Sequence, residues 1–268
     1  MISLSEDCLA SGSQDKTIKL WNMTNGNLTR TLTGHLLDVT SLIYTHDGFL
    51  FSSSGDSTIK KWDPSSGQLK KTLSGHSDWI NGMVIIGNLI VSASWDKTIK
   101  VWDISLEKQI RTLTDHSDKV NCLASLNNTH VASGSQDRTI KIWNIETGNL
   151  MRTMAGHTDF VNSLVALNSN SLASGSKDLT IKLWNVDSGR LNRSLIGHAQ
   201  EIFCMSKLYD YFFSGSADKT IKLWHAVNQN LVLTLTGTKK GVRSLTTLPN
   251  GYLASGSENN DIIIWEIK

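Results

Sequence analysis

The feature that most constrains this chain is an internal repeat. Seven segments resemble one another closely and end in a tryptophan, as in LASGSQDKTIKLW and IVSASWDKTIKVW. Successive tryptophans in this series are 40 or 41 residues apart, and they are Trp21, Trp62, Trp102, Trp143, Trp184, Trp224 and Trp265. A period this steady indicates repeated supersecondary units, each of which buries its faces against its neighbours.

The repeat unit has the pattern of β-structure. Around each tryptophan, aliphatic and β-branched residues alternate with polar ones, as in the segment 17–21, and turn residues such as Asn25-Gly26 follow. Each unit has room for four short antiparallel strands, and a ring of such units hides the faces of all of them. The sequence therefore predicts an all-β fold, a seven-bladed β-propeller of four-stranded antiparallel blades. With only two prolines and no proline-rich linker, residues 1–268 are expected to form a single domain.

Composition narrows the class of partners. The chain has 26 basic and 24 acidic residues, a net charge of +2 that gives little general attraction for nucleic acid. Its longest apolar stretch, 83–91, is far shorter than the roughly 20 residues of a membrane helix. The N-terminus lacks the pattern of a signal peptide, and three cysteines do not form a disulfide framework. We expect a cytoplasmic location, with the nucleus left open, and neither nucleic acid nor membrane as partner.

The repeats resemble the WD-repeat family, in which a Gly-His pair is followed by a Trp-Asp dipeptide in units of this length. The second dipeptide reads Trp-Asp in the second and third units, Trp-Asn in the first, fourth and fifth, Trp-His in the sixth and Trp-Glu in the seventh. The resemblance covers nearly the whole chain. It implies a propeller that acts as a binding platform for other proteins.

A serine, a histidine and an aspartate recur in five units and invite comparison with a hydrolase triad. With the tryptophan, the sets are Ser52, His35, Asp56, Trp62; Ser92, His76, Asp96, Trp102; Ser133, His116, Asp137, Trp143; Ser174, His157, Asp178, Trp184; and Ser214, His198, Asp218, Trp224. An enzyme needs one such constellation beside a pocket, and five near-identical copies cannot each be an active site. We expect no enzyme activity, no catalytic residue, no cofactor and no metal.

The family resemblance implies a structural role for these sets: the aspartate bonds the histidine, the histidine bonds the serine, and the serine bonds the indole N–H. Two other repeated positions are also expected to be structural. Cys122 and Cys204 stand six residues after the histidine, in a column (one repeat position compared across the units) that holds only small residues. We interpret them as packing residues. A lysine stands two residues before six of the tryptophans, at Lys19, Lys60, Lys100, Lys141, Lys182 and Lys222, and we interpret it as a solvated position with a packed aliphatic stem.

Binding should involve positions at which the repeats differ. In the WD-repeat family, partners often dock on the residues three and five past the histidine and on the residue before the aspartate. The two tryptophans outside the repeat series, Trp79 and Trp95, fall in these columns of one blade. Aromatic anchors within a charged rim are typical of binding hot spots, and the full set of candidates is Trp79, Trp95, Phe160, Phe203, Lys119, Lys177, Arg243 and Glu201. The alternative is that Trp79 simply packs on Trp95 and covers the blade.

The last unit departs most from the pattern, with Thr238 for histidine and Asn259 for aspartate. The sequence predicts that this blade lacks its outer strand, which leaves Ile262–Ile267 as an apolar edge. The expected reason is that the chain is a piece of a longer protein; capture of a partner strand at this edge is the alternative. We expect a non-catalytic scaffold or adaptor that binds proteins or peptides on the loop face around the channel. The alternative function is the recognition domain of a larger regulatory enzyme, such as a ubiquitin-ligase receptor or a kinase-linked propeller.

Overall fold

The computed structural model describes residues 1–267. Within them, 27 strands form seven antiparallel sheets, and there is no helix, so no helical segment of these residues is able to cross a membrane. Six sheets have four strands and the last has three. These seven sheets are blades, and the fold class is the all-β, seven-bladed β-propeller that the sequence predicts. The chain divides into two compact units, Met1–Val120 and the residues from Asn121 onward, and each is described by itself.

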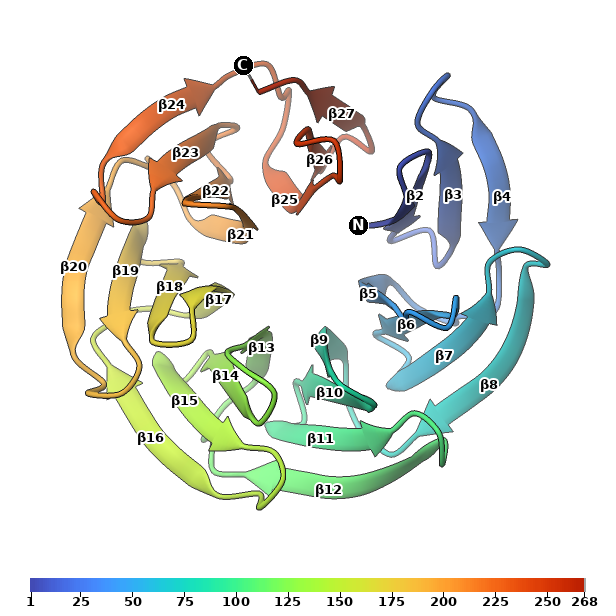
Figure 1. Ribbon diagram of the computed structural model, residues 1–268, viewed down its shortest axis with the longest axis horizontal. Helices are drawn as coiled ribbons and strands as arrows, with labels where there is room; N and C mark the ends of the chain where they lie inside the picture. Colours follow the sequence, from blue (N-terminus) through green and yellow to red (C-terminus); the bar gives the residue numbers. More distant parts are fainter. Residues whose placement is uncertain (268) are drawn as a thin grey trace. The chain divides into compact units, whose positions relative to one another are not determined.

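The first unit contains three sheets, each a meander in which consecutive strands are neighbours (Figure 1). Their strands are β1 (Ile2–Ser5), β2 (Cys8–Gly12), β3 (Ile18–Asn22) and β4 (Leu28–Leu32); β5 (Val39–Tyr44), β6 (Leu50–Ser54), β7 (Thr58–Asp63) and β8 (Gln68–Ser74); and β9 (Ile80–Ile86), β10 (Leu89–Ser94), β11 (Thr98–Asp103) and β12 (Lys108–Thr114).

The second unit contains four sheets of the same kind. Their strands are β13 (Val120–Ser125), β14 (His130–Ser135), β15 (Thr139–Asn144) and β16 (Leu150–Ala155); β17 (Val161–Asn168), β18 (Ser171–Ser176), β19 (Thr180–Asn185) and β20 (Leu191–Ile196); β21 (Ile202–Leu208), β22 (Tyr211–Ser216), β23 (Ile221–His225) and β24 (Leu231–Leu235); and β25 (Val242–Thr247), β26 (Leu253–Ser257) and β27 (Ile262–Trp265).

Within each unit, the core lies between neighbouring sheets, where five repeat tryptophans pack against the sheet that precedes their own. Trp62 of β7 joins a buried cluster with Ile18 and Leu32 of the first sheet, and Trp224 of β23 does the same with residues of β18 to β20. The Gly-His pair of the repeat is explained by this packing. A methyl group on Gly75 would lie 3.0 Å from the Trp102 ring, so the chain passes the indole too closely for a side chain.

The last sheet has three strands, as the sequence predicts, but its final strand is shorter than expected. β27 ends at Trp265, whereas the prediction extended the edge to Ile267. Ile267 lies outside the strand and packs, half-buried, against the core beside β23, together with Trp265. The alternating pattern of the sequence continues past the strand because burial against that core also selects an apolar residue.

Close approach of neighbouring sheets yields a test of the packing. A Cβ atom on Gly175 in β18 would lie 2.6 Å from Cγ2 of Ile202 in β21. We expect Gly175→Val to lower the free energy of unfolding by about 1–3 kcal/mol, because its methyl groups overpack this contact. Gly175→Ala should cost less, since Ala93 occupies the same column in β10. Urea unfolding measures both, and equal costs for the two variants would contradict the packing described here.

Candidate functional site

The repeated serine, histidine, aspartate and tryptophan form one connected chain of hydrogen bonds. In the second sheet, His35 lies on the loop between β4 and β5, and its Nδ1 is 2.8 Å from Oδ2 of Asp56. Its Nε2 is 2.7 Å from Oγ of Ser52, which also accepts the indole N–H of Trp62 over 2.8 Å. We call the loops that carry the histidines the histidine loops, and those between the second and third strands the aspartate turns.

The direction of the chain follows from its donors and acceptors. The indole N–H can only donate and the carboxylate can only accept. Ser52 therefore accepts from the indole and donates its hydroxyl proton to Nε2 of His35. The neutral histidine carries its proton on Nδ1 and donates it to Asp56, so every polar hydrogen in the set has one acceptor. This assignment of the tautomer rests on the network.

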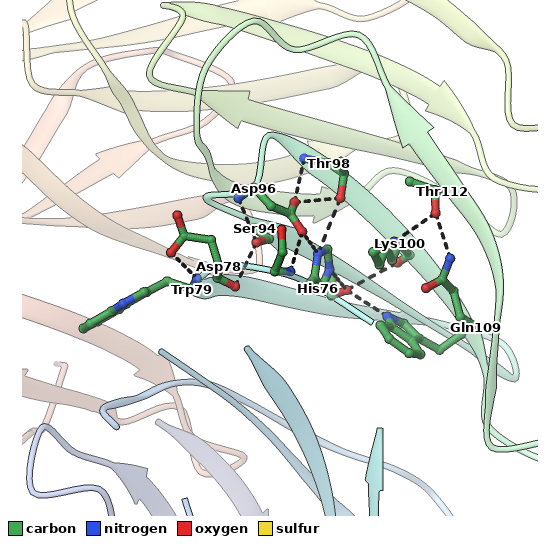
Figure 2. Close-up of polar contacts among 12 residues, drawn as sticks. His76, Asp78, Trp79, Ser94, Asp96, Thr98, Lys100, Gln109 and Thr112 are labelled. Atoms are coloured by element: carbon green, nitrogen blue, oxygen red, sulfur yellow. Dashed lines mark hydrogen bonds and ion pairs between the residues drawn. The ribbon is translucent and has the colours of Figure 1, made fainter. Parts of the chain in front are cut away.

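The other sets repeat this geometry. In the third, fifth and sixth sheets, all three links measure 2.7–2.8 Å. Figure 2 shows the third sheet, with His76 beside Asp96. In the fourth set, Trp143 donates to Ser133 over 2.8 Å, and His116 is buried. The hydrogen-bond chain that the resemblance implies is thus present in the second, third, fifth and sixth sheets, and the described bond of the fourth agrees with it.

A threonine two residues past the aspartate completes each turn and was missed by the sequence analysis. In the third sheet, Oδ1 of Asp96 accepts the backbone N–H of Thr98 over 2.9 Å and its hydroxyl over 2.7 Å. The residue between them, Lys97, has a φ of 70°, and residues other than glycine rarely adopt this left-handed backbone conformation. The bonds to the carboxylate hold that conformation in place. The signal was present in the sequence, because six of the seven repeats read Asp-x-Thr.

The first and last sheets have other partners at these positions. In the first sheet, whose histidine position precedes residue 1, Lys19 donates to Oδ2 of Asp15 over 2.7 Å. In the last sheet, the buried Thr238 donates its hydroxyl to the backbone carbonyl of Lys219. In both, the tryptophan still donates to its serine over 2.8 Å. The serine–tryptophan bond is therefore the element common to all seven sheets.

Burial separates these sets from a hydrolase triad with similar links. The side chains of Ser52, Ser92 and Ser174 are fully buried, and each oxygen already accepts an indole N–H. A nucleophile needs a path to the substrate. These serines are fully buried and have none.

The lysine column is less solvated than the sequence analysis predicts. Five lysines donate to a hydroxyl on the fourth strand of their own sheet, as Lys60 does to Thr72 over 3.0 Å. Lys60, Lys141 and Lys222 are buried. The prediction of a solvated position is wrong for these three. Their side chains extend to a threonine on the neighbouring fourth strand, and the sequence of the third strand alone does not reveal this partner.

Packing explains the two cysteines in the column of small residues. Burial raises the pKa of the Cys204 thiol to about 12 and that of Cys122 well above its usual range. The nucleophilic form is the thiolate, so neither thiol is activated. Among residues 1–267, no group of three or more His, Cys, Asp or Glu side chains is arranged to hold a metal ion.

Removing one carboxylate tests the hydrogen-bond chain. We expect Asp178→Ala to lower the free energy of unfolding by at least about 2 kcal/mol, because His157 and the amide of Thr158 lose their acceptor, at about 1–3 kcal/mol for each buried group. Asp15→Ala is the matched control, since this aspartate is exposed and accepts from Lys19. Thermal and urea unfolding measure the difference. An equal loss in the two variants would contradict the proposed role.

Stability should also fall with pH in two steps. Burial lowers the pKa of His35 and His198 below the ordinary value of 6.5, although their aspartates oppose the shift. The unfolded chain then binds more protons below about pH 6.5, so stability declines as the pH falls through that value. Burial raises the pKa of the Asp56 carboxyl, but bonds from Thr58, Leu36 and His35 outweigh it and lower that pKa to about 2. A second decline is therefore expected between pH 3.8 and about 2, and melting temperatures from pH 8 to pH 2 measure both.

The candidate binding columns are held together by the backbone. The carbonyl of the residue three past the histidine accepts the N–H of the residue before the aspartate, as in Trp79 and Trp95 at 2.8 Å. The same bond joins Phe160 to Lys177 and Glu201 to Ala217. Each histidine loop thus lies beside the aspartate turn of its sheet, and side chains from both reach the same surface.

In the first unit, the aromatic candidates form a stacked series. The rings of Trp79 and Trp95 are 5.1 Å apart and inclined by 16°. A Cβ atom on Gly55 would lie 2.8 Å from the other face of the Trp79 indole, and Nζ of Lys119 lies 4.0 Å from the centre of the Trp95 ring. Figure 2 shows the Trp79 indole extending away from the hydrogen-bonded set. Trp79 therefore packs on Trp95, and both side chains are half-buried.

In the second unit, each aromatic candidate has a cation over its ring. Nζ of Lys177 lies 4.8 Å from the centre of the Phe160 ring, and Cζ of Arg243 lies 3.6 Å from that of Phe203. Arg243 is also paired with Glu258, with 2.6 Å between Nη2 and Oε1. The structure thus joins the candidates in pairs of ring and cation. Glu201 is linked to the aspartate turn of its sheet through its backbone carbonyl, which accepts the N–H of Ala217 over 3.0 Å.

The column five past the histidine has a second role that the sequence analysis missed. Asn162 donates its side-chain amide to the backbone carbonyl of Ile202 over 3.1 Å, and Asn121 makes the same bond to Val161. These amides tie the first strand of one sheet to that of the next. The occurrence of asparagine at this position in three successive repeats, at Asn81, Asn121 and Asn162, was the available signal.

Seven sheets of one pattern, each with a serine–tryptophan hydrogen bond and with variable loops at one end, define a repeat protein. The family model described as "WD domain, G-beta repeat" matches residues 2–22, 26–63, 67–103, 107–144, 148–185, 189–225 and 229–266. The chain therefore belongs to the WD-repeat family, as the sequence indicates. No curated protein matches it. Each matched segment after the first begins with the fourth strand of one sheet and ends with the third strand of the next, so each repeat joins two sheets covalently.

Proposed function

We propose that this chain is a non-catalytic scaffold or adaptor that binds proteins or peptides through its histidine loops and aspartate turns. The fold is one that commonly serves as a protein-interaction platform. The nearly balanced charge supports protein partners over nucleic acid. The three free thiols support a location in the cytoplasm or nucleus.

The observation that carries the proposal is the pairing of rings and cations at positions where the repeats differ. Three aromatic side chains, Trp95, Phe160 and Phe203, each have a cationic group within 5 Å of the ring centre. A side chain held in this way has less freedom to lose when a partner binds, which raises affinity. Aromatic and cationic side chains are also the types that most often dominate binding energy at interfaces.

The indole of Trp95 adds a specific donor. Its Nε1 is buried and has no hydrogen-bond partner in the described residues. An unpaired donor of this kind costs free energy, and an acceptor supplied by a partner would recover it. Because this atom is covered in the free chain, we infer that the Trp95 ring turns before a backbone carbonyl or a side-chain oxygen of the partner accepts its N–H.

A capture experiment with a double variant tests this function. We expect Trp79→Ala combined with Trp95→Ala to lose at least about tenfold in partner capture from a lysate, because the ring edges and the indole donor are both removed. The matched control is Leu106→Ala combined with Tyr209→Ala, which removes two exposed side chains from turns at the opposite end of the third and sixth sheets. Captured proteins are identified by mass spectrometry.

Because Trp79 also packs over Gly55, the melting temperature of each variant is measured alongside capture. A double variant that stays folded and still retains its partners would contradict binding at this surface. Loss of the same partners in the control variant would place the interface at the other end of the sheets.

A further inference from the structure

The fourth strand of each complete sheet is an open edge. β4, β8, β12, β16, β20 and β24 each end the strand order of their sheet (Figure 1). Such an edge presents unpaired backbone N–H and C=O groups and can pair with another strand. Natural proteins block this pairing most often with a charged side chain, especially lysine, on the edge.

Five of these edges carry a basic residue at one register position, and the sixth does not. Relative to the third strand, the equivalent pairs are Arg30 with Leu20, Lys71 with Lys61, Arg111 with Val101, Arg152 with Ile142, Arg193 with Leu183, and Leu233 with Leu223. β24 therefore has leucine where the other fourth strands have arginine or lysine.

In at least two sheets, the basic residue donates hydrogen bonds to a turn of the next sheet. Arg30 donates to the carbonyls of Ser65 and Ser66 in the turn of the next sheet, over 3.0 and 3.1 Å. Arg152 reaches the carbonyl of Ser188 in the same way. Leu233 cannot form such a bond, so the change at this position removes both a charge and a clamp.

The whole of β24 is uncharged and apolar on its accessible side. Leu231, Val232 and Leu233 are 41%, 49% and 41% exposed. The turn that precedes the strand adds Val227, which is 72% exposed. The other five fourth strands each contain at least one lysine or arginine. Among the fourth strands of the described residues, β24 alone combines an open edge, three consecutive exposed apolar residues and no charge.

We propose that β24 pairs antiparallel with β24 of a second copy of this chain, so that the protein forms a two-fold symmetric dimer. Two identical strands that run antiparallel present the same groups to each other, which makes the contact self-complementary. The open backbone groups of both edges become paired, and the exposed leucines and valines of the two strands meet as cross-strand neighbours.

The occupant follows from the charges. Pairing of β24 with β8 would bury Lys70 and Lys71 beside leucine and valine, and pairing of β8 with itself would place like charges opposite each other. A second β24 is the one edge of the fourth-strand type among the described residues that avoids both penalties. A single strand pair is a small interface, so the dimer is expected to be weak and concentration-dependent.

Sedimentation equilibrium of the full chain over a range of concentrations tests the proposal. We expect a monomer–dimer equilibrium for the natural sequence, and an increase of at least about tenfold in the dimer dissociation constant for Leu233→Arg. This variant restores the charge of the other edges at an exposed site. Asn192→Arg is the matched control, because it adds the same charge to β20, which already carries Arg193, and it should leave the dimer unchanged.

A third variant, Ile264→Arg, distinguishes the competing edge at β27, since Ile264 is 40% exposed there. It should also leave the dimer unchanged. A natural chain that stays monomeric throughout would overturn the proposal, and so would a dimer that Ile264→Arg dissociates while Leu233→Arg does not. Hydrogen exchange gives an independent check that does not depend on a variant: the amides of β24 should gain protection as concentration rises.

Discussion

The fold depends on satisfying one buried donor, the indole N–H of the repeat tryptophan. The indole must be buried because it fills the space between two sheets, and its N–H must then be accepted by something inside. Serine on the neighbouring strand accepts it at 2.8 Å in all seven sheets, including the first and the last. Histidine and aspartate extend the chain outward and fix the loops. The repeat therefore combines a packed indole with a series of hydrogen bonds that leads from the indole N–H through serine and histidine to the aspartate turn.

The sequence was sufficient to predict whatever is encoded by periodicity. The seven sheets, the buried sets and the three-stranded last sheet all follow from residues that recur every 40 or 41 positions. Features that depend on distances between strands were not predicted. The ammonium group of Lys19 bonds to Asp15, whereas that of Lys60, at the same repeat position, bonds to the hydroxyl of a threonine. Asn162 and Asn121 bond to the next sheet, which no pattern within one repeat indicates. For the candidate site, the sequence identified the columns, and the pairing of each ring with its cation required the structure.

The rigid and the variable columns are connected by the backbone. Because His76 and Asp96 hold the third histidine loop against its aspartate turn, Trp79 and Trp95 are brought together by a bond between their own backbones. The side chains at these two positions can then change from sheet to sheet without disturbing the strands below. Trp79 and Trp95 therefore stack on each other, and both side chains are half-buried.

The same separation applies to the edge of the sixth sheet. Its hydrogen-bonded set is complete, with links of 2.7–2.8 Å, so the loss of the basic residue at Leu233 does not reflect a sheet that is degenerating as a whole. The last sheet, by contrast, has Thr238 and Asn259 in place of the histidine and the aspartate. An edge strand that stays extended on a rigid sheet loses little conformational freedom when another strand pairs with it. An apolar edge on a well-ordered sheet is therefore a better binding surface than the same residues on a frayed one, and β24 meets that condition.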